Sequence, residues 1–144
     1  MPNSDRPQAP GYLANLMARL FHEVSSDGLA PLGIAPAQFP LLVELWFGDS
    51  PASRERFRAS QEMGAAEVDA LVDAMEAAGL IEEAREPGAS IRLTPAGEAA
   101  RGPAVAAARR ANAAAAAALS EDEMTLFIDM MNRVIDALQG AKAR

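Results

Sequence analysis

The sequence has no cysteine and only one histidine among its 144 residues. A chain without thiols has no disulfide framework, no thiolate nucleophile and no cysteine-ligated metal site, and it is consistent with a reducing, cytoplasmic environment. It also lacks a glycine-rich phosphate loop, and a single imidazole gives no distinctive Ser-His-Asp set. We therefore expect a cytoplasmic protein that is not an enzyme and that carries no cofactor or metal.

Long hydrophobic runs are absent as well. No apolar run reaches the roughly 20 residues that span a bilayer, and the alanine run Ala113–Ala118 lies between an Arg-Arg pair and a group of acidic residues. The first ten residues are polar and rich in proline, which is typical of a flexible arm rather than a secretion signal. These features predict a soluble protein with no membrane partner.

Basic side chains are scarce. Thirteen lysines and arginines face twenty acidic residues, for a formal net charge of -7. Because phosphate binding depends mainly on Lys and Arg displacing counterions, this balance argues against broad attraction to nucleic acid. The length suits a single domain, and the many alanines favour helix.

Apolar residues recur at helical spacing in several segments. The patterns predict helices over residues 11–26, ended by Asp27-Gly28, over 36–47 and, after a Ser53 cap, over 54–62. A further helix follows Gly64 and ends at Gly79. A long helix from the Thr94 cap to about residue 118, with a kink at Gly102-Pro103, precedes a last helix that starts at the capping box Ser120–Glu123.

A small hairpin is predicted between the fourth and fifth helices. Residues 80–85 and 90–94 flank Glu86-Pro87-Gly88-Ala89, and Pro-Gly is a turn signal. The order of elements is therefore a helix-turn-helix followed by a two-stranded wing, with helices before and after it.

Four sequence blocks resemble, in order, those of the MarR-family transcription regulators. They are LGIAPAQFPLLVEL (32–45), VDALVDAMEAAGLI (68–81), LTPAG (93–97) and LSEDE (119–123). The resemblance implies a mostly α fold with a small β-hairpin wing, in which a winged helix-turn-helix over residues 36–94 binds DNA. It also implies dimerisation helices over 11–35 and 95–144, after a flexible arm over 1–10.

The resemblance further implies a homodimer held by the first, fifth and sixth helices, with the fourth helix in the major groove of operator DNA. The terminal helices support the dimer independently, because their apolar stripes exceed what one small domain can cover. A monomer that folds its ends back on itself is the alternative. The function implied is a repressor that a small molecule modulates.

The candidate DNA-contacting residues come from the third helix, the start of the fourth and the hairpin. From residue 54 to 101 there are six basic side chains against ten acidic ones, and the fourth helix has acids but no Lys or Arg. Ala65-Ala66-Glu67 stands where the family usually presents Ser, Thr or Arg, and the wing tip is short. A solvated surface whose arginines pair with nearby glutamates is the alternative. The candidates are Arg54, Arg56, Arg58, Ser60, Gln61, Ala65, Ala66, Glu67, Arg85 and Arg92.

A ligand pocket is a second hypothesis. In the family a small aromatic or anionic effector often binds between the dimerisation helices and the winged helix. Aromatic residues at helical spacing are more often core, so the pocket competes with a purely structural role. The candidate residues are Met17, Phe21, His22, Phe39 and Trp46.

Another function stays open beside the DNA-binding regulator. The acidic fourth helix is equally typical of a winged-helix protein that has lost DNA binding and serves as a protein-interaction or ligand-binding module.

Overall fold

The computed structural model describes residues 5–86 and 90–144. Within these ranges the chain forms the six α-helices and the two-stranded antiparallel sheet expected from the sequence, and also two short 3-10 helices that were not predicted. The elements, in chain order, are α1 (Pro10–Leu29), η1 (Ala30–Leu32), η2 (Pro36–Gln38), α2 (Phe39–Phe47), α3 (Arg54–Gln61), α4 (Ala65–Ala77), β1 (Ile81–Glu83), β2 (Ile91–Leu93), α5 (Pro95–Ala116) and α6 (Glu121–Lys142).

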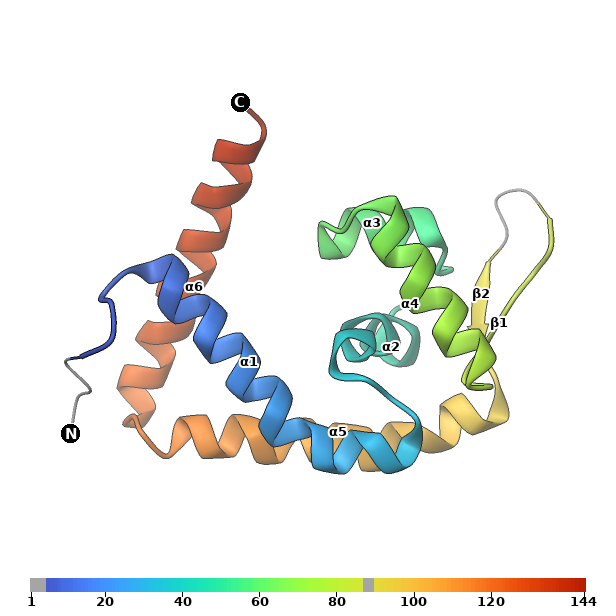
Figure 1. Cartoon of the computed structure of the whole chain (residues 1–144), viewed down its shortest axis with the longest axis horizontal. Helices are drawn as coiled ribbons and strands as arrows, with labels where there is room; N and C mark the ends of the chain where they lie inside the picture. Colours follow the sequence, from blue (N-terminus) through green and yellow to red (C-terminus); the bar gives the residue numbers. More distant parts are fainter. Residues whose placement is uncertain (1–4, 87–89) are drawn as a thin grey trace.

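Figure 1 shows two parts joined by α5. The α2–α4 helices and the hairpin form a compact lobe at one end of α5, and α1 lies along α5 toward the other end. From there α6 turns back, and its C-terminal end reaches Glu62 in the turn between α3 and α4. The lobe contains the elements from α2 to β2, and α1, α5 and α6 lie outside it.

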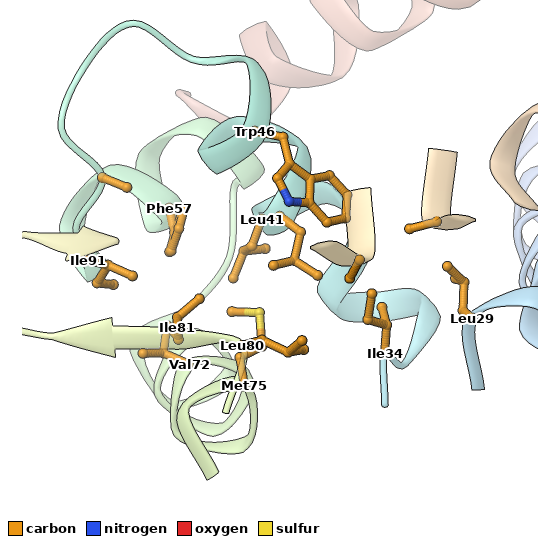
Figure 2. Close-up of a cluster of buried hydrophobic side chains, with 14 of the residues drawn as sticks. Leu29, Ile34, Leu41, Trp46, Phe57, Val72, Met75, Leu80, Ile81 and Ile91 are labelled. Carbon is orange, nitrogen blue, oxygen red and sulfur yellow. The ribbon is translucent and has the colours of Figure 1, made fainter. Parts of the chain in front are cut away.

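The hydrophobic core lies inside the lobe (Figure 2). Leu41 and Leu42 of α2, Phe57 of α3 and Val72 of α4 are almost completely buried. Their positions match the apolar stripes of the sequence, so burial of these side chains provides most of the drive that assembles the three helices. Leu80, Ile81 and Ile91 extend the same core to the hairpin.

The hairpin pairs Ile81 with Leu93, Glu82 with Arg92 and Glu83 with Ile91. Its second strand is also tied to the segment before α3, because the Ile91 amide donates to the Ala52 carbonyl oxygen at 2.8 Å. The turn predicted at 86–89 falls mostly outside the described residues, and so does the first part of the predicted arm. The hydrogen bond between Ile91 and Ala52 therefore fixes the base of the hairpin to the lobe.

One predicted helix end is wrong. Asp27-Gly28 does not terminate the first helix, which continues to Leu29. A side chain at Gly28 would meet the Ala107 Cβ at 2.6 Å and the Arg110 guanidinium at the same distance. Gly28 is therefore required for the close approach of α1 to α5, and close approach of two backbones is an alternative use of glycine to ending a helix.

The long fifth helix begins at the predicted cap, where the Thr94 Oγ1 accepts a hydrogen bond from the Gly97 amide at 3.1 Å. It continues through Gly102 and Pro103 as one helix. Alanines on its inner face, Ala100, Ala104 and Ala107, are buried against the other helices. Small side chains at these positions let α1 and the lobe pack closely onto α5.

The last helix, α6, leaves its apolar face uncovered. None of its residues is buried in the single chain. The large side chains Leu126, Ile128, Met130, Val134, Ile135 and Leu138 are exposed, Leu138 to 64%. Tyr12, Leu20 and Val24 of α1 are exposed too. Large apolar side chains left exposed in such number on one helix typically mark an interface.

Among the described residues no single helix is both long and apolar enough to cross a membrane, although the bent pair Pro10–Leu32 and Pro36–Phe47 meets the length and composition requirement jointly.

The capping box at the start of α6 gives a testable pH dependence. The Glu123 carboxylate accepts from the Ser120 amide at 2.8 Å, and the Ser120 hydroxyl accepts from the Glu123 amide. Both hydrogen bonds lower the pKa of Glu123, and the bond from the Ser120 backbone amide has the larger effect. The depressed pKa means that the stabilisation is present above the ordinary carboxyl pKa and is lost as pH falls through the lowered value.

We expect a carbon-13 NMR titration to place the Glu123 midpoint below that of an ordinary glutamate. Ser120→Ala should move the midpoint back toward the ordinary value, since one half of the box is lost. Thr125→Ala, which removes only a bond to the Glu121 carbonyl, is the control and should leave it in place. An unshifted Glu123 midpoint in the wild-type protein would contradict the capping box.

Candidate nucleic-acid interface

The candidate interface is formed by α3, the turn after it, α4 and the hairpin. Ser53 caps α3 by accepting a hydrogen bond from the Arg56 amide at 3.1 Å, as the sequence predicted. At the other end Glu62 takes a left-handed conformation, with φ of 55°, and turns the chain into α4. This short turn fixes the angle between the two helices, which together form a helix-turn-helix.

The exposed side of α4 differs from the negative face that its sequence suggests. Val68, Val72 and Met75 are buried, and the 100° advance per residue places four alanines on the opposite side. Asp69, Asp73 and Glu76 lie on one flank of that side instead. The outermost alanines are Ala66, Ala70, Ala74 and Ala77, all exposed.

A single arginine holds the acidic flank of α4 against the hairpin. The Arg54 guanidinium donates to Glu83 of β1 with its Nε at 2.9 Å, to Asp69 with Nη1 at 2.9 Å and to Asp73 with Nη2 at 2.7 Å. The Glu83 contact, followed by those to Asp73 and Asp69, raises the pKa of Arg54 above its ordinary value. These three carboxylates bind the guanidinium that the sequence assigned to DNA phosphate, and form with it an ion-pair cluster that joins α3, α4 and β1.

Glu76 completes the connection from α4 to the hairpin. Its Oε2 accepts a hydrogen bond from the Glu83 amide at 3.1 Å. Glu83 is therefore held through both its side chain and its backbone. Asp69, Asp73 and Glu76 therefore remain exposed, but each also has a partner within the chain.

The other predicted residues of α3 remain on the surface. Arg56, Arg58 and Ser60 are exposed and Gln61 is half-buried. The Ser60 hydroxyl donates weakly to the Phe57 carbonyl oxygen at 3.4 Å. Arg56 is on the same short helix as Arg54 but has no ion pair among those found in the described residues. Arg58 is likewise exposed and absent from these ion pairs, so both side chains are placed to meet an external anion.

The start of α4 and the hairpin supply the remaining predicted contacts. Ala65, Ala66 and Glu67 form the exposed first turn of α4. On the hairpin Arg85 and Arg92 are exposed, and Arg92 forms one loose ion pair with Glu82, at 3.7 Å. Because exposed pairs of this length contribute little, Arg92 is free to exchange Glu82 for another anion.

The residues of the predicted ligand pocket separate into two places. Met17 and Phe21 line an apolar groove of about 250 Å³ between α1 and α5, together with Leu20, Val24 and three alanines of α5. Trp46 is instead buried in the core, where its indole N–H donates to the Gly97 carbonyl oxygen at 3.0 Å. Phe39 contacts it edge-on, with ring centroids 6.0 Å apart, and His22 is exposed.

Several contacts could not be predicted from the sequence because they join segments that are far apart along the chain. Glu62 accepts from Gln139 at 3.1 Å and pairs with Lys142 at 3.2 Å, which connects the α3–α4 turn to the end of α6. Arg101 of α5 lies over the Phe47 ring at 4.4 Å. The only sequence signal for the Arg54 cluster was the i, i+4 spacing of Asp69 and Asp73, which places two carboxylates on one side of a helix.

The arrangement resembles that of solved regulators. A probable transcriptional regulator from Pseudomonas aeruginosa is 25% identical, with a TM-score of 0.77 over 88% of this chain and 97% of its own. A putative MarR-family regulator from Listeria monocytogenes, solved with a 26mer DNA, is 17% identical, with a TM-score of 0.79 over 92% of this chain and 90% of its own. Neither a protein-family model nor a curated protein matches the chain.

A MarR-family protein from Mycobacterium tuberculosis is a third similar structure. In its DNA complex it is 25% identical, with a TM-score of 0.64 over 90% of this chain and 98% of its own. The same protein has been solved with p-aminosalicylic acid. The Pseudomonas and Listeria neighbours are transcriptional regulators by name. Their likeness extends over both the lobe and the flanking helices.

Proposed function

Because the chain has the winged-helix fold of MarR-family transcription regulators, we propose that it is a homodimeric regulator that binds double-stranded operator DNA. The observation that carries the proposal is the joint presence of a helix-turn-helix, a wing and uncovered terminal helices in one chain. Related structures hold DNA in the same fold. In this proposal residues 36–94 bind DNA, and residues 11–35 and 95–144 dimerise.

The proposed binding mode places α4 in the major groove with its alanine side toward the bases. Alanine contacts the thymine methyl group but makes no hydrogen bond, so phosphate contacts must supply most of the affinity. We assign these to Arg56 and Arg58 of α3 and to Arg85 and Arg92 of the hairpin, with Ser60 and Gln61 beside them. Ala65, Ala66 and Glu67 enter the groove first, and Glu67 accepts a hydrogen bond from a cytosine amino group.

The proposed repressor is released by a small aromatic or anionic molecule. The apolar groove between α1 and α5, with Met17 and Phe21 on its wall, has the size for one aromatic ring. A related protein has been solved with such a compound. Salicylate should raise the melting temperature of the wild-type protein, and Phe21→Ala should remove that rise. No change in the melting temperature at millimolar salicylate would count against this effector class.

DNA binding is tested by selection of duplexes from a random library on the wild-type protein, followed by measurement of affinity against salt concentration. Arg56→Gln should weaken binding to the selected duplex by about tenfold. It should also reduce the slope of log affinity against log salt by about one, since one phosphate contact is lost. Arg92→Gln should behave in the same way.

Arg133→Gln is the control, because Arg133 lies on α6 and pairs with Asp129. It should leave both affinity and slope unchanged. If low salt yields no selected duplex, the chain is not a DNA-binding regulator, and the protein-interaction module becomes the better interpretation of its acidic lobe.

A further inference from the structure

Arg54 is the least exposed of the arginines in the candidate interface, and each of its three guanidinium nitrogens donates to a carboxylate. Its Nε and Nη2 donate to Glu83, while Nη1 and Nη2 reach Asp69 and Asp73. The side chain is 29% exposed, against 79% for Arg92. A forked guanidinium is suited to several carboxylates at once, which an ammonium group is not.

The cluster lies directly beside the surface that would face DNA. Asp69 and Asp73 are separated by one turn on the flank of α4, next to the exposed alanines. Three carboxylates and one guanidinium leave the cluster with a net charge of two negative units. Without the guanidinium all three carboxylates would be unpaired, and each would repel phosphate from the same place.

We propose that Arg54 is a positioning residue that allows α4 to approach DNA without touching DNA itself. It partly neutralises Asp69 and Asp73, keeps them turned toward the hairpin and fixes the hairpin to α4 through Glu83. The alanine side of the helix is thereby left as the leading surface. This role rests on the DNA binding proposed above.

A positioning role for Arg54 differs from a direct phosphate contact, because the effect of replacing Arg54 then depends on the charges of Asp69, Asp73 and Glu83. If Arg54 acts through the three carboxylates, its replacement matters only while they are charged. If it contacts phosphate, its replacement costs the same whether they are charged or not. Double-mutant comparison separates the two cases, because coupled residues are non-additive and independent ones add.

The experiment measures affinity for the duplex selected by the wild-type protein in two backgrounds. Arg54→Gln should lower affinity at least tenfold in the wild-type background. In the background Asp69→Asn/Asp73→Asn/Glu83→Gln the same replacement should change affinity less than threefold and leave the salt slope unchanged. Arg54→Lys, which keeps the charge but not the fork, should fall between wild type and Arg54→Gln.

Arg56→Gln is the matched control and should cost the same factor in both backgrounds. Melting temperatures confirm that each variant is folded, and the neutralised background supplies a folded form of Arg54→Gln if the single variant is unstable. An equal loss from Arg54→Gln in both backgrounds would overturn the positioning role. Failure of the wild-type protein to select any duplex would instead overturn the proposed function, and then Arg56→Gln would have no effect either.

Discussion

Ile135→Glu/Leu138→Glu should convert a dimer into monomers and raise its dissociation constant by more than a thousandfold. Both side chains are at least half exposed in the single chain, and burying each would contribute about 1.5–3 kcal/mol. In a two-fold interface both replacements occur twice, so the loss exceeds the roughly 4 kcal/mol that a thousandfold change requires. Sedimentation equilibrium measures the change directly.

The control for this prediction is Asn132→Glu, which adds a charge on the side of α6 that carries Asp129 and Asp136. It should leave the dimer intact. Circular dichroism should show that both variants keep their helices, because the α6 cap at Ser120 is untouched. A wild-type protein that sediments as a monomer at micromolar concentration would refute the proposed role of α1 and α6.

Gly97→Ala should destabilise the folded chain by about 3 kcal/mol, near the upper end of the range for overpacked positions. Gly97 is buried in the first turn of α5, and an added Cβ would collide with the Leu80 carbonyl oxygen. Because that atom belongs to the backbone, the helix must shift. The shift also disturbs the hydrogen bond from the Trp46 indole to the Gly97 carbonyl.

Urea unfolding followed by the fluorescence of Trp46, the only tryptophan, reports this loss as a lower midpoint with an unchanged slope. Gly102→Ala is the matched control, since it lies in the same helix with open space around it. It should stabilise the chain by up to about 1 kcal/mol through helix propensity. Equal stability of the two variants would contradict the packing of α5 against the hairpin.

The sequence was sufficient to predict the elements and their order, because each depends on local chemistry. The caps at Ser53, Thr94 and Ser120 form the predicted hydrogen bonds. The apolar stripes around Leu41 and Val72 form the core. Gly28 was misinterpreted because a glycine that ends a helix and one that admits a neighbouring helix are identical in a sequence.

The candidate interface was predicted less well, since its chemistry depends on which segments meet. Arg54 was assigned to phosphate because nothing local shows that Glu83 lies within 2.9 Å of the Arg54 guanidinium. Trp46 was assigned to a ligand pocket because a sequence does not distinguish an aromatic side chain in a groove from one in the core. In the structure Arg54 and Trp46 bind within the chain, whereas Arg56, Arg58, Arg85 and Arg92 remain exposed.

Sedimentation velocity of the wild-type protein mixed with its selected duplex tests the central claim most directly. The proposed regulator should form a complex of two chains on one duplex. Raising the salt concentration should release the DNA from that complex without dissociating the protein dimer. The dimer survives because its interface is apolar, whereas the phosphate contacts are screened. A duplex that sediments alone at low salt, or with a single chain bound, would contradict the account.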